Sequence, residues 1–203
     1  MGSEQIKRKH RLRLAVLVAC AAVMLAGLTV VLLTVLLPKD KPTPEPGSRP
    51  ISFYPVWEGD ARENEQYLGL DRQFYLCNPD YGIKEALDAG QMDSDPKLAL
   101  LRDYINSLID GYPNACRALF TASALAETPV PDFAQQMIWQ VEITETETKT
   151  ENGVARTTYC LEYRIYRNNG TYRRDVGSNA VRPEYLTLIE IADGEYRIDS
   201  LRR

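Results

Sequence analysis

An uninterrupted apolar stretch stands out near the start of the chain. The 24 residues from Leu14 to Leu37 carry no charge. At about 1.5 Å per residue they form a helix of about 36 Å, which is long enough to cross a bilayer with some tilt. The pattern therefore predicts one transmembrane helix over residues 14–37, preceded by a cytoplasmic basic tail over residues 1–13.

The charges that flank this stretch predict its orientation. Five basic residues precede the stretch: Lys7, Arg8, Lys9, Arg11 and Arg13. Only Lys39 and Lys41 follow it, and the negative charge of Asp40 offsets one of them. By the positive-inside rule, the N-terminus lies in the cytosol and the C-terminal domain lies outside the cell membrane. The run is longer than the roughly 7–15 apolar residues of a signal peptide, so we expect a retained anchor rather than a cleaved signal.

A cysteine inside the stretch leaves one alternative open. The residues from Leu17 to Cys20 resemble the lipobox of bacterial lipoproteins, in which the cysteine is lipidated and becomes the new N-terminus. However, the chain stays apolar for 17 residues beyond Cys20, where lipoproteins usually turn polar. We therefore keep the transmembrane anchor and treat a lipid anchor as the alternative.

A proline-rich segment separates the apolar stretch from the rest of the chain. Residues 38–50 contain five prolines. Such a composition favours extended polyproline conformations and forms a semi-rigid spacer. It predicts a linker over residues 38–50 and one extracytoplasmic α+β domain over residues 51–203.

Helical periodicity is clearest in the middle of this outer domain. Asp95 is suited to cap a helix and Pro96 to occupy its first position, and Gly111 is suited to end it. The apolar residues between them recur at spacings of three and four, which predicts one buried stripe: Leu98, Leu101, Ile105 and Leu108. A second, shorter helix is predicted from about Pro113, with Cys116, Leu119 and Phe120 buried.

The last third of the chain alternates between apolar and polar residues, which is typical of strands with one buried face. The buried set in the clearest strand is Tyr159, Leu161, Tyr163 and Ile165. Asn-Gly and Asp-Gly pairs at 152–153, 169–170 and 193–194 punctuate the pattern and predict hairpin turns, hence an antiparallel meander.

The buried positions also predict how the strands pair. A three-residue loop at 151–153, with Gly153 in a left-handed conformation, places Ile143 opposite Leu161 and Val141 opposite Tyr163. In the last hairpin, a two-residue loop at 193–194 places Ile189 opposite Ile198.

Helices followed by a meander that ends in the hairpin Glu190–Ile198 resemble the nuclear transport factor two-like superfamily. The resemblance covers about residues 95–203. It implies an α+β fold in which N-terminal helices pack on a curved antiparallel meander sheet to form a cone with a pocket. The layout of basic tail, single span, proline-rich spacer and outer domain is also similar to uncharacterised envelope proteins of Gram-positive bacteria.

Charge restricts the partners of the outer domain. With the 8 basic and 3 acidic residues of positions 1–50 set aside, residues 51–203 carry 16 Lys+Arg and 25 Asp+Glu, a net charge of −9. Such a domain is poorly suited to nucleic acid and to an anionic lipid surface. We expect the chain to contact the membrane through Leu14–Leu37, and an envelope protein to be its partner.

Residue types restrict the chemistry further. His10, in the basic tail, is the only histidine, so the outer domain can hold neither a Ser-His-Asp triad nor histidine-ligated zinc. The outer domain has three cysteines, an odd number that cannot form a complete disulfide framework, and Cys77 with Cys116 is the one pair worth testing. We expect no metal, no cofactor and no enzymatic activity.

The resemblance nevertheless keeps an enzyme open as an alternative. Ketosteroid isomerases of this superfamily use an aspartate base together with a tyrosine and a protonated aspartate. By that resemblance Tyr104, Tyr159 and Tyr163 are candidate pocket-lining residues, with Asp103 or Asp110 nearby. The simpler interpretation is that these tyrosines fill the core and carry their hydroxyl groups to its rim.

A basic, aromatic stretch is the candidate binding surface. Arg164, Tyr166, Arg173 and Arg174 are predicted on a hairpin around Asn169-Gly170, where they would face an anionic partner. Alternatively they form an ordinary solvated strand surface. The sequence thus predicts a membrane-anchored extracytoplasmic binding or scaffold domain of a bacterial envelope. The alternatives are a pocket enzyme of isomerase or dehydratase type and a lipid-anchored ligand-binding protein.

Overall fold

The structure, a computed structural model, describes residues 50–151 and 153–203. The predicted basic tail, transmembrane helix and all of the linker except Pro50 lie outside these residues. Within the described part, no helix combines the length and the apolar character that a membrane crossing requires.

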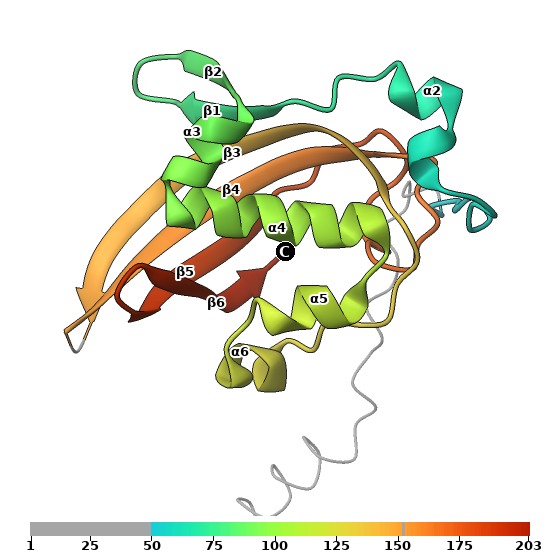
Figure 1. The fold of residues 1–203 in the computed structure, drawn as a ribbon. Coiled ribbons are helices and arrows are strands. Elements are labelled where there is room, and N and C mark those ends of the chain that lie inside the picture. Colours follow the sequence, from blue (N-terminus) through green and yellow to red (C-terminus); the bar gives the residue numbers. More distant parts are fainter. Residues whose placement is uncertain (1–49, 152) are drawn as a thin grey trace, which may run out of the picture. The chain divides into compact units, whose positions relative to one another are not determined.

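One mixed sheet of six strands, in the order β2-β1-β3-β4-β5-β6, organises the described residues (Figure 1). Four consecutive strands form an antiparallel meander: β3 (Met137–Glu151), β4 (Val154–Tyr166), β5 (Glu184–Ala192) and β6 (Glu195–Arg202). β1 (Phe74–Asn78) pairs in parallel with β3 and antiparallel with β2 (Ile83–Leu87). The predicted α+β class and the antiparallel meander are confirmed, and β1, which joins β3 in parallel, makes the sheet as a whole mixed.

Helix α4 (Pro96–Asp110) supplies the helical side of the core. Its ends follow the sequence signals: the Asp95 side chain accepts hydrogen bonds from the first turn, and Gly111, at φ 68°, closes the last turn. The apolar stripe of α4 packs against the buried face of β3 to β6, and Figure 1 shows the long strands β3 and β4 curving around it. The predicted helix and its buried face are confirmed.

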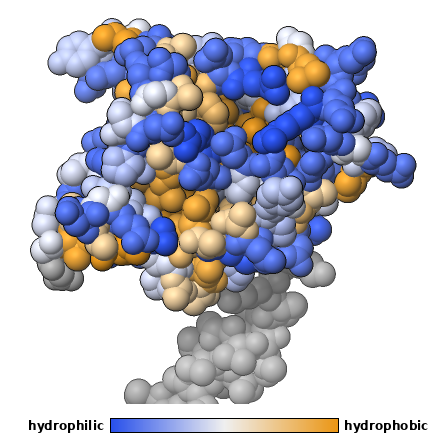
Figure 2. Space-filling model, viewed as in Figure 1, coloured by the Kyte–Doolittle hydropathy of each residue, from blue (hydrophilic) through white to orange (hydrophobic). Residues whose placement is uncertain are grey.

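Shorter helices surround α4. They are η1 (Ala61–Glu63), α2 (Glu65–Leu68), α3 (Ala89–Ser94), α5 (Pro113–Ala118) and α6 (Ala122–Glu127). Helix α5 buries Cys116, as predicted, and Phe120 is buried just after the helix ends. Figure 2 shows that hydrophobic residues on this side gather below α4, toward β6 and α6, on a surface that is otherwise mainly hydrophilic.

Bulges set the register of the β3–β4 hairpin. Ile143 lies opposite Leu161, as predicted. The predicted three-residue loop is wrong, because Glu151 pairs with Val154 and leaves only two residues between the strands. The shorter loop and the predicted Ile143–Leu161 pair are both possible because Thr146 forms a bulge. It is the extra residue in β3 where the register shifts between Glu145 and Glu147.

Two further irregularities modify the predicted pairs. Val141, expected directly opposite Tyr163, lies within a register shift between Trp139 and Glu142. In the last hairpin a shift between Glu190 and Ala192 places Ile198 opposite Leu188 rather than Ile189. Since Leu188 and Ile198 are both buried, the shift brings two core residues together. The predicted Ile189–Ile198 pair is therefore wrong.

The chain before α2 lies along the connection between β4 and β5. The backbone N–H of Tyr54 donates to the carbonyl of Asn168, and the Phe53 ring covers Gly170 so closely that a Cβ there would lie 2.7 Å from the ring. The Arg167 guanidinium stacks over the rings of Tyr54 and Trp57. Residues 53–57 therefore pack against the start of the connection between β4 and β5.

Candidate functional site

The carboxylate of Glu184 is completely buried. Three side chains donate hydrogen bonds to it, and a fourth forms an ion pair with it. Its Oε2 accepts from the hydroxyls of Tyr104 at 2.9 Å and Tyr163 at 2.8 Å. Its Oε1 pairs with Nη1 of Arg173 at 3.1 Å and with Nε of Arg203 at 2.7 Å. A buried charge requires such partners, because leaving it unpaired in a low-dielectric interior is costly.

The tyrosines around Glu184 come from three different parts of the chain. Tyr104 lies on α4, Tyr163 on β4 and Tyr172 on the connection to β5. Since the Tyr104 hydroxyl proton goes to Glu184, the hydroxyl of Tyr172 donates to the oxygen of Tyr104. Burial, and next the negative charge of Glu184, raises the pKa of all three phenols well above the usual value.

Arg173 connects Glu184 to a second carboxylate. Its side chain is only 1% exposed, and it makes a two-point contact with Asp175, with Nε and Nη2 each 2.8 Å from a carboxylate oxygen. Burial opposes ionisation of Asp175, but the hydrogen bond and charge of Arg173 outweigh it and lower the pKa of that carboxyl. Two guanidiniums and two carboxylates thus form a neutral network.

The local backbone explains why Arg173 points inward. The buried Asn168 side chain donates to the carbonyls of Arg173 and Val176 and accepts from the N–H of Gly170. These bonds fold residues 168–176 into a closed loop instead of a hairpin, a common role of asparagine side chains in turns. The predicted hairpin around Asn169-Gly170 is therefore wrong, and Arg173 does not lie on the surface.

An arginine-lined groove of about 500 Å³ lies directly above this network. We use this name for the hollow lined by Pro131, Asp132, Thr171, Tyr172, Arg174, Asp175, Arg182 and Arg203. Arg203 belongs to both sites: its Nε binds Glu184, and its guanidinium stacks on the Tyr172 ring with 4.5 Å to the ring centroid. The groove is the place where the buried network meets solvent.

The structure separates the residues that the sequence grouped as a binding surface. Arg174 lines the groove and Arg173 lies beneath it. Arg164 instead contacts Gln140 and the carbonyl of Asn179 and stacks on Trp139. Tyr166 donates to Gln66, which lies in α2. Of the four predicted residues, only Arg174 lies both at the surface and in the groove.

The three predicted pocket tyrosines are also separated. Tyr104 and Tyr163 meet at Glu184, whereas Tyr159 donates to Glu145 in the neighbouring strand. Sequence reasoning missed Glu184, Arg182 and Arg203. The one available signal was that Glu184 opens a strand in which Leu186 and Leu188 alternate as core residues, which places Glu184 on the same buried face.

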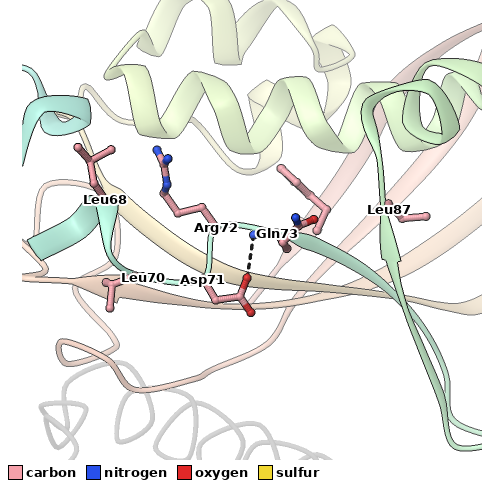
Figure 3. A pocket seen from close by; sticks show the side chains of 7 residues that line it. Leu68, Leu70, Asp71, Arg72, Gln73 and Leu87 are labelled. Atoms are coloured by element: carbon pink, nitrogen blue, oxygen red, sulfur yellow. Dashed lines mark hydrogen bonds between the residues drawn. The ribbon is translucent and has the colours of Figure 1, made fainter. Parts of the chain in front are cut away.

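A second hollow, of about 440 Å³, lies between α2 and β1 and is lined by Leu68, Leu70, Asp71, Arg72, Gln73, Phe74 and Leu87. Figure 3 shows the Asp71 carboxylate turned back toward the backbone of Gln73 and away from the Arg72 side chain. Since its charged groups do not converge on one point, we give it less weight than the groove.

The cysteines add no site. Cys77, Cys116 and Cys160 are all free, so the tested Cys77–Cys116 pair is not a disulfide. Burial raises the pKa of the Cys116 thiol to about 11, which makes it a poor nucleophile. Among residues 50–151 and 153–203 there is no cluster of acidic, cysteine or histidine side chains that could hold a metal ion.

No protein-family model, curated protein or solved structure matches the chain.

Proposed function

We propose that this protein is a membrane-anchored extracytoplasmic binding domain of a bacterial cell envelope, and that a protein partner docks on the arginine-lined groove. The observation that carries the proposal is the groove itself. On a domain of net charge −9, it gathers Arg174, Arg182 and Arg203 at one concave place. Positive surface of this kind orients and selects anionic partners.

The state of Glu184 favours binding over catalysis. A general base must reach a substrate proton directly or through one water. The two oxygens of Glu184 already accept three hydrogen bonds and form an ion pair with Arg173, and the side chain is fully buried. In this setting the carboxylate acts as a structural anchor that positions arginines, rather than as the base of an isomerase or dehydratase.

The anchor and the cone fold belong to the same proposal. The apolar run Leu14–Leu37 and its basic flank favour one transmembrane helix with the C-terminal domain outside. A linker of 13 residues reaches about 40 Å if it is extended as polyproline. Helix α4 against the antiparallel meander β3 to β6 supports a cone of the nuclear transport factor two-like type.

The binding proposal is tested by charge reversal in the full chain. Tagged wild-type protein and the Arg174→Glu/Arg182→Glu variant are purified from their native membranes, and the co-purifying envelope proteins are compared. Neither arginine contacts Glu184: Arg174 donates to the carbonyl of Gly170, and Arg182 reaches Asp175 at 3.4 Å with a side chain that is 53% exposed. We therefore expect the variant to keep its fold, and circular dichroism checks this. We expect the variant to lose the partner. Equal recovery from wild type and variant would remove the groove from the interface.

A matched control separates the groove from net charge. The Arg62→Glu/Arg72→Glu variant carries the same change of charge at exposed positions outside the groove. It should retain the partner. Loss of the partner from both variants would mean that recovery depends on overall charge and not on the groove.

The anchor is tested separately. Protease added to intact spheroplasts should digest the outer domain and leave a membrane-embedded fragment that contains Leu14–Leu37. Complete protection of the outer domain would reverse the proposed orientation.

A further inference from the structure

We infer that the arginine-lined groove recognises clustered carboxylates of a short acidic peptide segment. This inference rests on the proposed function, because it specifies the chemistry of the partner at the same groove. Four features of the groove support it: unused donors, fixed arginines, neutralised acids and limited size.

The unused donors lie at the ends of the three arginines. Arg174 uses Nε, which donates to the carbonyl of Gly170 at 3.2 Å, and Arg203 uses Nε for Glu184. Arg182 uses only Nη1, at 3.4 Å from the carbonyl and a carboxylate oxygen of Asp175. Within the described residues, the terminal nitrogens of Arg174 and Arg203 and Nη2 of Arg182 have no acceptor. Guanidinium groups with free terminal nitrogens match the two oxygens of a carboxylate.

Two of the arginines are already fixed in place. Arg203 is tied to a buried carboxylate and stacked on Tyr172, and its side chain is 28% exposed. Arg174 is tied to the backbone of the closed loop. Because less side-chain entropy is lost when such groups bind, they contribute more to affinity than mobile arginines do. Arg182, whose side chain is 53% exposed, can adjust to the ligand.

The acids in the groove are already paired with cations. Asp175 makes a two-point contact with Arg173 and a longer one, at 3.4 Å, with Arg182, and Asp132 is paired with Arg117, which does not line the groove. Asp175 therefore offsets part of the charge of Arg182, whereas neither acid of the groove is paired with Arg174 or Arg203. Pro131 adds an apolar contact to the lining, which suits the aliphatic part of a peptide side chain.

The surrounding charge limits the size of the ligand. A domain of net charge −9 repels an extended polyanion such as a nucleic acid or an anionic bilayer. Exposed charges are screened beyond about 8 Å at physiological ionic strength. A compact group of carboxylates can therefore occupy the groove while the rest of its chain is screened from the acidic surface.

The test uses the full chain in detergent micelles and a fluorescent, end-capped peptide of alternating aspartate and glutamate. We expect saturable binding that weakens when the ionic strength rises from about 0.15 M to about 1 M, since the Debye length falls to about 3 Å. Arg174→Glu/Arg182→Glu should weaken binding at least about tenfold, because attraction is replaced by repulsion. Arg174→Gln/Arg182→Gln should weaken it less, and the Arg62→Glu/Arg72→Glu control should stay within about twofold.

Three results would overturn the inference. They are the absence of saturable peptide binding to wild type, equal affinity of wild type and the groove variant, and an equal loss of affinity in the control variant. The peptide is added to purified protein, so the result does not depend on the envelope partner. If the groove variant loses the envelope partner but wild type does not bind the peptide, the inference that the groove recognises carboxylates fails and the proposed function stands. If the peptide binds but partner recovery is unchanged, the proposed function fails.

Discussion

Nε of Arg203 donates a hydrogen bond to Oε1 of Glu184 at 2.7 Å. The bond connects the residue just after β6 with the first residue of β5. The same Oε1 pairs with Arg173. Two guanidiniums on one carboxylate oxygen explain how a charged side chain is tolerated in the core. They also make the carboxylate necessary, because each arginine would otherwise be a charge without its buried counter-ion.

The Glu184→Gln variant should therefore be strongly destabilised. It keeps the shape of the side chain but removes the charge that Arg173 and Arg203 share. Breaking a buried ion pair typically costs about 3–5 kcal/mol. Urea unfolding followed by the fluorescence of Trp57 and Trp139 measures the difference. As a control, Glu162→Gln removes a carboxylate that lies opposite Glu142 in the sheet, so it should be close to neutral. Equal effects of the two variants would contradict the role assigned to Glu184.

Removing single hydroxyl groups should rank the tyrosines. Tyr104→Phe removes one donor to Glu184 and leaves the Tyr172 hydroxyl without its acceptor, so we expect a loss of about 1–3 kcal/mol. Tyr159→Phe removes a bond to Glu145, which is exposed, and should cost less than about 1.5 kcal/mol. Unfolding free energies of the two variants, measured side by side, decide the order. A larger loss in Tyr159→Phe would contradict it.

Stability should fall on the alkaline side. Burial and the charge of Glu184 raise the pKa of Tyr104, Tyr163 and Tyr172 in the folded state. The unfolded chain therefore loses these protons first, at about pH 10, and unfolding becomes more favourable as the pH rises further. The contribution is fully present below that pH. Phenolate absorbance recorded together with circular dichroism should show these three tyrosines ionising only as the protein unfolds. Ionisation of all tyrosines in the folded protein would contradict this.

Thiol labelling should distinguish the three described cysteines. Cys116 is fully buried and burial raises its pKa to about 11, whereas Cys77 and Cys160 are partly exposed. In a Cys20→Ser background, iodoacetamide at neutral pH should modify Cys77 and Cys160 first and Cys116 only in urea. Mass spectrometry of the labelled peptides reads out the order. If Cys116 were modified as early as Cys77 and Cys160 in the native protein, the thiol would be accessible to solvent, which would contradict its burial.

Two glycines offer a matched test of backbone strain. Gly111 and Gly194 both have a left-handed conformation, at φ 68° and 72°. A Cβ at Gly111 would lie 2.7 Å from the backbone nitrogen of Gln135, whereas a Cβ at Gly194 meets nothing within 4 Å. Gly194→Ala should therefore cost about 1–2 kcal/mol from the conformation alone, and Gly111→Ala should cost more. Equal melting temperatures of the two variants would contradict this comparison.

Local signals account for the parts of the fold that the sequence predicted. Asp95, Pro96 and Gly111 define helix α4 because capping and left-handed closure involve only neighbouring residues. The alternation from Tyr159 to Ile165 identifies the buried face of β4, since a strand exposes every second side chain. The pairing of Ile143 with Leu161 was likewise predicted from burial.

Contacts between distant residues decided the rest. The sequence alone determined helix α4, the start of α5, and the buried faces of α4 and β4, because those patterns repeat within a few residues. It could not place Arg173 inside, since the closed loop that turns it inward depends on Asn168 and on partners at Asp175 and Glu184. Nor could it locate the bulge at Thr146. This extra residue allows the hairpin to have a two-residue turn while Ile143 still lies opposite Leu161. The groove exists only where the segment before β3, the β4–β5 connection and the residue after β6 meet, because long-range packing brings its arginines to one place.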